Sequence, residues 1–178
     1  FNSFVNDIST KEFNNGEYDP GKRNMHMMAL SYVSADLEPL ITAPDNLVER
    51  NMGLQYGKTA MFLWLLRENV LGTKRFDDAF REYIHRWAYK HPAPDDFFRT
   101  MEDVSGEDLG WFWRSWVLNN WKLDQAVTNV KYVNNNPENG AIVTVKNMRE
   151  IPMPITIEIT TEGGKKIRKS LPVEIWKK

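Results

Sequence analysis

A glycine–lysine–threonine run is the first stretch of the sequence whose residue types could do chemistry. Gly57-Lys58-Thr59 matches the end of a phosphate-binding loop, in which backbone amides and a lysine hold nucleotide phosphates. That motif needs a glycine six residues before the lysine, and Met52 occupies that position. Gly53 comes one residue too late, and no strand precedes the run to present it. The pattern therefore does not support a nucleotide site.

Metal-ligating residue types are present, but they do not have ligand spacing. Glu82-x-x-His85 is half of a di-metal helix motif, which needs a second copy and two further carboxylates. Met25-His26-Met27-Met28 could supply soft copper ligands, although methionines at helical spacing usually fill a core. His26, His85 and His91 are scattered, the sequence has no cysteine, and H-E-x-x-H is absent. By spacing alone we expect no metal site and no cofactor site in this chain.

A tryptophan-rich stretch could bind sugars by stacking. On a helix, one face would combine five apolar residues: Leu109, Phe112, Trp113, Trp116 and Val117. Such a face is typical of a helix that packs on a core. Trp111 would point the other way, and we expect it to pack on a neighbouring domain or to be exposed. A sugar-binding module that uses Trp111 and Trp121 is kept as a weaker alternative.

The elements that must position these residues are helical up to about residue 122. Apolar residues recur at helical spacing, which predicts six helices. These helices are expected to begin near Phe1, Met25, Asn51, Thr73, Pro94 and Ser105. Gly16 and Asp19-Pro20-Gly21 are expected to end the first helix, and Pro39 and Pro44 to bracket an irregular connection. Thr73 is the expected cap of its helix, and Ser105 with Asp108 the expected capping box of the last one, which should run to about Asn119.

Two of these helices have distinct patterns. The helix from about Asn51 to Leu71 is apolar nearly all round over 60–66, which predicts burial on most sides. The next helix is amphipathic, with one apolar stripe: Phe76, Ala79, Phe80, Tyr83, Ile84 and Trp87. On its exposed face we expect the i,i+4 ion pairs Asp77–Arg81 and Glu82–Arg86.

From Val127 onward the pattern changes to strands. Alternation predicts four of them, over residues 127–133, 141–147, 153–160 and 166–173. Asn139-Gly140 and Gly163-Gly164 are typical hairpin turns. Four strands joined in this way look like part of a sandwich, since about seven are expected for an immunoglobulin-like domain. We therefore expect an α+β chain with a helical part at 1–122 and a partial β-sandwich at 123–178.

Composition and charge exclude several classes of protein. The chain has 178 residues, no cysteine and a formal net charge of -1. The missing cysteines exclude a disulfide scaffold and a thiolate site, and the charge balance argues against a nucleic-acid partner. The longest apolar run, 60–66, is far shorter than the ~20 residues that cross a bilayer. Since the chain opens at Phe1 inside an apolar pattern, we expect it to be a piece of a longer protein.

Two stretches of the sequence resemble a known family. Tyr56-Gly57-Lys58-Thr59-Ala60, together with the apolar run after it, is similar to the Tyr-x-Lys-x-Ala helix of aminopeptidase N-type zinc metallopeptidases (peptidase family M1, gluzincins). Thr59 stands where these enzymes more often have glycine. Phe1-Asn2-Ser3-Phe4 resembles the residues that follow the family's third zinc ligand, a glutamate, and its glycine. Further apolar and acidic landmarks follow in the family's order: Phe76, Tyr83, Asp95-Asp96-Phe97-Phe98, Ser105-Gly106, Asp108-Leu109, Phe112 and Trp116.

The resemblance implies a fold and a reaction. Residues 1–122 would be the helical C-terminal half of a thermolysin-like catalytic domain, and 123–178 the start of the β-sandwich that follows it. In this family two histidines and one glutamate hold zinc, a glutamate is the general base, and a tyrosine stabilises the tetrahedral oxyanion. Tyr56 is the residue of this chain that matches one of these roles. The zinc ligands would lie upstream of Phe1, so we expect zinc in the parent protein and none in this piece, which alone would cleave no peptide.

Two readings of the function remain from different classes. The first is a part of a zinc metallopeptidase that acts on peptide amino termini, with a peptide as the parent's substrate. The second is a non-catalytic interaction or scaffold module built from helices and a β-sandwich. In either case apolar surface and open strand edges favour self-association. Compartment and side-chain preference stay open, with an exported or cell-envelope location favoured by the resemblance.

Overall fold

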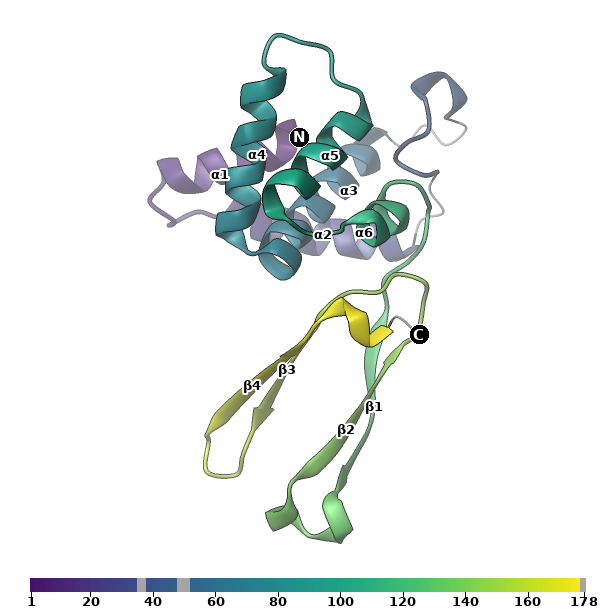
Figure 1. Cartoon of the computed structure of the whole chain (residues 1–178). Coiled ribbons are helices and arrows are strands. Elements are labelled where there is room, and N and C mark those ends of the chain that lie inside the picture. Colours follow the sequence, from purple (N-terminus) through teal and green to yellow (C-terminus); the bar gives the residue numbers. More distant parts are fainter. Residues whose placement is uncertain (35–37, 48–51, 177–178) are drawn as a thin grey trace. The chain divides into compact units, whose positions relative to one another are not determined.

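The computed structural model describes residues 1–34, 38–47 and 52–176 of the chain. The chain divides into two compact units, Phe1–Asn120 and Trp121–Lys178, and each is described by itself. The first unit is helical and the second contains the strands (Figure 1). The expectation of an α+β chain is therefore confirmed.

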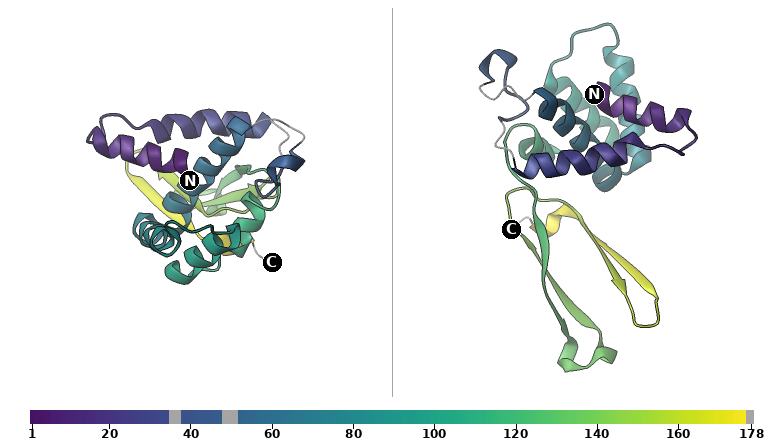
Figure 2. Two further views of the ribbon diagram at one scale, coloured as in Figure 1. Left: turned by 90° about the horizontal axis from the view of Figure 1, so that it is seen from above. Right: turned by 180° about the vertical axis from the view of Figure 1, so that it is seen from behind.

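The first unit contains six α-helices among its described residues. They are α1 (Asn2–Phe13), α2 (Pro20–Ser34), α3 (Met52–Leu65), α4 (Thr73–Trp87), α5 (Pro94–Ser105) and α6 (Gly110–Trp116). A 3-10 turn, η1 (Pro44–Asn46), lies in the connection between α2 and α3, and a π-helical segment, η2 (Leu66–Leu71), continues α3. Helix α3 contacts both α1 and α2, as the two views of Figure 2 make visible. The expected start of the third helix at Asn51 lies outside the described residues.

Several helix ends differ from the sequence expectation. Pro20 opens α2 instead of closing the first helix, because proline is tolerated in a first helical turn, where its missing N–H is not needed. Thr73 does not cap α4: the capping residue is Gly72, whose φ of +78° lets the chain turn sharply out of η2.

The last helix was also expected to be longer than it is. Ser105 is the final residue of α5 rather than a cap of α6, since Gly106 in the left-handed conformation ends α5 there. Helix α6 covers only seven residues. Its start is held by the Glu102 carboxylate of α5, which accepts hydrogen bonds from the Leu109 N–H at 3.0 Å and the Trp113 indole at 3.2 Å.

The core of the first unit is rich in aromatic rings. Phe4 contacts Trp64 and Phe76 edge-on, with ring centroids 5.1 and 5.5 Å apart, so α1, α3 and α4 meet at one point. Phe62 of α3 contacts Phe112 of α6 at 6.1 Å. The predicted face of the last helix is buried in full: Leu109, Phe112, Trp113, Trp116 and Val117. The predicted burial of the second half of α3 is also confirmed, although Leu65 is only half-buried.

The second unit consists of two antiparallel hairpins. Strand β1 (Gln125–Tyr132) pairs with β2 (Ala141–Asn147), and β3 (Ile155–Thr160) pairs with β4 (Lys166–Leu171). All four strands were predicted to within two residues at each end. Asn139-Gly140 does not make a two-residue turn, because two 3-10 turns, Val133–Asn135 and Pro137–Asn139, lengthen that connection. Gly163-Gly164 does lie in a tight turn, closed by the Gly164 N–H on the Thr161 carbonyl at 2.8 Å.

Few side chains of the second unit are buried. The buried apolar ones among the described residues are Ile151, Met153 and Val173. The Met153 carbonyl accepts hydrogen bonds from the Gln125 amide at 3.0 Å and the Trp176 indole at 2.8 Å. Residues before β3 and after β4 are thereby tied to the start of β1.

Candidate active site

The candidate site is the first half of α3, which carries Tyr56. The Tyr56 side chain is 61% exposed, whereas Ala60 and the next residues of the helix are buried. Within residues 1–34, 38–47 and 52–176, the Tyr56 hydroxyl makes no hydrogen bond, so it is available to a ligand as a donor. An aromatic alcohol on a helix with a buried second half is a donor on a rigid support.

Gly57 follows Tyr56 and serves helix packing. A Cβ atom built at this position would lie 1.8 Å from the Met28 sulfur of α2. With glycine here the Met28 side chain lies directly against the α3 backbone, and a larger residue would require that flexible side chain to move. This packing accounts for the glycine and agrees with the rejection of a phosphate-binding loop from the sequence.

Lys58 is buried, which the sequence reasoning missed. Its side chain is 1% exposed. Its ammonium nitrogen lies 3.5 Å from the Asn119 carbonyl oxygen, to which it donates a hydrogen bond, and 5.4 Å from the centroid of the Tyr32 ring. The signal for this burial in the sequence is a charged residue inside an otherwise apolar helix.

An apolar groove of about 250 Å³ lies beside Thr59 within the first unit. Its walls come from the residue before α1, from α3, α4 and the start of α5, from the connections before η1 and between α4 and α5, and from the residue after α6. The lining residues are Phe1, Leu40, Ile41, Thr59, Phe62, Tyr83, Pro92, Ala93, Pro94, Phe97, Phe98 and Val117. Burial raises the pKa of the Tyr83 hydroxyl, and the negative charge of Asp96 raises it further, so this tyrosine is neutral at neutral pH.

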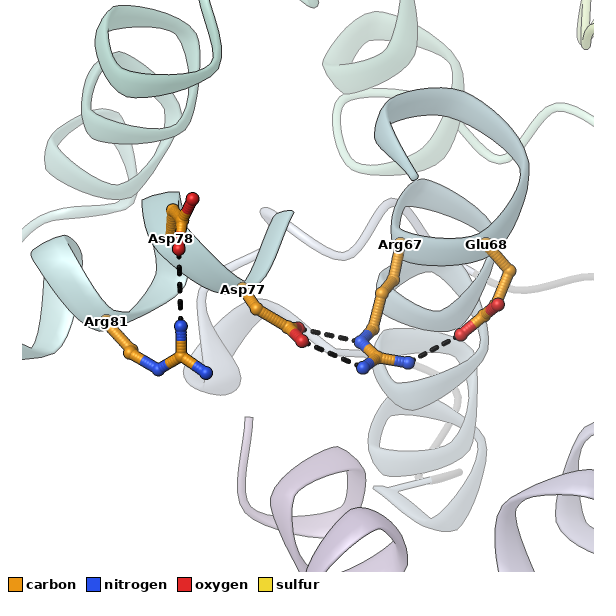
Figure 3. Close-up of polar contacts among 5 residues, drawn as sticks. All are labelled: Arg67, Glu68, Asp77, Asp78 and Arg81. Carbon is orange, nitrogen blue, oxygen red and sulfur yellow. Dashed lines mark hydrogen bonds and ion pairs between the residues drawn. The ribbon is translucent and has the colours of Figure 1, made fainter. Parts of the chain in front are cut away.

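A network of ion pairs centred on Arg67 lies in η2, the segment that continues α3. Arg67 donates two hydrogen bonds to the Asp77 carboxylate of α4, at 2.7 and 2.8 Å, and also pairs with Glu68 (Figure 3). The hydrogen bonds with Asp77 are the main reason that the pKa of the Arg67 guanidinium lies above its ordinary value. The expected Asp77–Arg81 pair is therefore wrong: Arg81 pairs with Asp78 instead, at 3.3 Å. The expected Glu82–Arg86 pair is confirmed at 2.6 Å.

The other candidate residues do not assemble into a site. Glu82 is engaged by Arg86, and His85 is exposed. Among the described residues, no three histidine, aspartate or glutamate side chains gather so that they could hold a metal ion. Trp111 and Trp121 are half-buried and belong to different units. In the part of the chain that the structure describes, no helix is both long and apolar enough to cross a membrane.

Comparisons with known proteins give one family. The family model described as the peptidase family M1 domain matches residues 7–116. Two proteins of Oryza sativa subsp. japonica, Aminopeptidase M1-D and Aminopeptidase M1-C, are each 31% identical to this chain over 64 residues. The match covers 36% of this chain and 7% of the length of each relative. No solved structure matches the chain significantly. Since the family model covers more than half of the residues and includes the helix of Tyr56, this chain belongs to peptidase family M1.

Proposed function

We propose that this chain is part of the catalytic domain of a zinc-dependent aminopeptidase and that Tyr56 is its oxyanion-stabilising residue. The observation that carries the proposal is the exposed hydroxyl of Tyr56 on a helix that is otherwise anchored in the core. The family match, which includes this helix, and the names of the two rice relatives support the reaction class.

The role assigned to Tyr56 follows from the chemistry of peptide hydrolysis. Attack of water on the scissile carbonyl produces a tetrahedral intermediate whose oxygen carries negative charge. A preorganised hydroxyl that donates a hydrogen bond to this oxygen stabilises the transition state more than the bound substrate. Tyr56 can donate in this way because a phenolic hydroxyl is a hydrogen-bond donor.

Zinc is implied by the family, but the described residues do not fit a zinc site. His26, His85 and His91 lie on separate segments, and no metal-holding group is found among the described residues. Bound zinc would polarise the scissile carbonyl and activate water. We assign its ligands, together with the general base, to parts of the parent protein other than the residues described.

We also propose an architecture for each of the two units. The helical unit would be the second half of a thermolysin-like domain, and the two hairpins the first strands of an immunoglobulin-like sandwich, with a boundary near residue 122. The division of the chain between Asn120 and Trp121 supports such a boundary.

The exposed apolar residues of the hairpins, among them Val127, Val130 and Ile142, support self-association of this piece in isolation.

The test is the Tyr56→Phe variant of the full-length protein that contains this chain. With an aminoacyl chromogenic substrate, we expect kcat to fall by about 100- to 1,000-fold, as when an oxyanion-hole donor is removed, while the bound zinc measured by atomic absorption is unchanged. Tyr89→Phe is the matched control, since Tyr89 is a fully exposed tyrosine of the same unit, and it should leave kcat as it is. An active Tyr56→Phe enzyme would contradict the assignment.

A further inference from the structure

We propose that Lys58 is a positioning residue for Tyr56: its buried ammonium fixes the turn of α3 that carries the tyrosine. This inference rests on the function proposed for Tyr56. It concerns a different side chain, which does not contact the substrate but determines where the hydroxyl of its neighbour points.

The burial of Lys58 requires a reason beyond filling space. Taking an ammonium group out of water costs several kcal/mol even after the protein relaxes. Methionine has nearly the same length and would fill the same volume without that cost. A lysine that is 1% exposed is thus explained by contacts that only a charged donor can make.

Those contacts join three elements of the first unit. The Lys58 ammonium donates to the carbonyl of Asn119, in the segment that follows α6, and lies over the ring of Tyr32 in α2. Tyr32 in turn stacks on Trp116 of α6, with centroids 5.8 Å apart. Among the described residues, Lys58 therefore links α3 to α2 by a cation–π contact and to the segment after α6 by a hydrogen bond.

Helix geometry links this anchor to the direction of Tyr56. Residues two positions apart are separated by about 200° around a helix axis, which is why Tyr56 is exposed while Lys58 is buried. Gly57, between them, is pressed against Met28. Rotation of this turn about the helix axis would break the Lys58 contacts and drive the backbone at Gly57 away from α2. The same contacts therefore fix the side from which the Tyr56 hydroxyl projects.

Displacement of the Tyr56 hydroxyl would weaken the stabilisation of the transition state. An oxyanion donor works at about 2.7–3.1 Å from the developing charge, and a misplacement of about 1 Å can cost about 100-fold in rate. Loss of the Lys58 anchor should accordingly lower kcat while leaving KM largely unchanged, because the ground state does not use the hydroxyl.

The experiment is a double-mutant cycle in the full-length, zinc-loaded protein. Lys58→Met should lower kcat by about 10- to 100-fold, with KM and the circular dichroism spectrum unchanged. In the Tyr56→Phe background, Lys58→Met should cause no further loss, since its effect passes through the hydroxyl. Lys74→Met is the control, because Lys74 is an exposed lysine that pairs with Asp78 one turn along α4, and it should leave kcat unchanged.

A binding measurement gives a second readout that does not depend on turnover. A phosphinic dipeptide, whose tetrahedral centre resembles the intermediate, should bind Lys58→Met more weakly by the same factor in calorimetry. Tyr56→Phe and the double variant should bind it equally. If Lys58→Met does not fold, the cycle is run with Tyr32→Leu, which removes the ring beneath the ammonium, and the same non-additivity is expected.

The outcomes separate this inference from the function on which it rests. If Tyr56→Phe is fully active, the proposed function fails and this inference fails with it. If Tyr56→Phe is impaired but Lys58→Met is not, only the positioning role is overturned. Losses that multiply in the double variant would also overturn it, because an anchor with a general structural role would act independently of the hydroxyl.

Discussion

The helical unit and the β unit of this chain bury their side chains to very different extents. In the helical unit whole aromatic rings are inaccessible, and even a lysine is enclosed. In the β unit the strands are largely exposed on both faces, and three apolar side chains outside the strands are the buried ones among the described residues. Backbone pairing gives each hairpin its register, but a hairpin without a packed face is only marginally stable and supplies no core that could position a catalytic group.

The contrast explains where a rigid site can be placed. An oxyanion donor needs a support whose rotamers and helix axis are locked by packing. Helix α3 packs against α1 and α2, and its continuation η2 packs against α4. Within residues 121–176 the strand faces are largely exposed, so we expect them to serve as surface for other protein segments rather than as a place for chemistry.

The largest predicted difference between the units concerns core truncation. Leu63→Ala, at a fully buried position in α3, should lower the free energy of unfolding by about 2–5 kcal/mol. Ile142→Ala, at a position of β2 that is 47% exposed, should lower it by about 1 kcal/mol at most. Urea unfolding followed by far-ultraviolet circular dichroism measures both. Equal effects would show that the β unit has a core comparable to that of the helical unit.

Removal of charged contacts should destabilise the two units by different but smaller amounts. Asp77→Asn weakens the two hydrogen bonds that join α4 to Arg67, whose side chain is only 18% exposed, so we expect a loss of about 1–2 kcal/mol. Glu158→Gln in β3 removes exposed pairs with Lys166 and Arg168, and such pairs contribute about 0–1 kcal/mol. Thermal unfolding at low and high salt distinguishes the two, since only the exposed pairs should lose their contribution in salt.

The smallest expected effect comes from adding one methyl group. Gly57→Ala places a Cβ against the Met28 sulfur, and the strain of about 1–3 kcal/mol is partly offset by a gain of about 1 kcal/mol in helix propensity. We expect a net loss of about 1 kcal/mol. Gly163→Ala in the β3–β4 turn, where nothing lies within 4 Å of the new atom, should be nearly neutral.

A second substitution tests the cause of the Gly57 effect. Met28→Ala removes the obstructing side chain, so Gly57→Ala should become stabilising in that background. If it remains destabilising there, close packing of α2 on α3 is not the reason for the glycine.

Local patterns in the sequence predicted most elements of both units. Helical spacing found all the described α-helices, and alternation found the four strands, because element type follows from the periodicity of apolar residues. The ordered motif around Tyr56 pointed to the peptidase family for a related reason, since its residues are neighbours along one helix. The apolar face from Leu109 to Val117 was likewise identified, because its members share one or two turns.

Features that depend on distant residues were not predictable in this way. Asp77 has Arg81 one turn away on its own helix but accepts hydrogen bonds from Arg67 of η2. Glu102 of α5 accepts a hydrogen bond from the backbone at the start of α6. Among the described residues, the buried Lys58 ammonium contacts Tyr32 of α2 and the Asn119 carbonyl after α6, both far from it in the sequence. Periodicity along the chain thus establishes which residues form an element and which face is apolar. The choice among competing partners for a charged group depends on which helices meet in space, because those partners come from different elements.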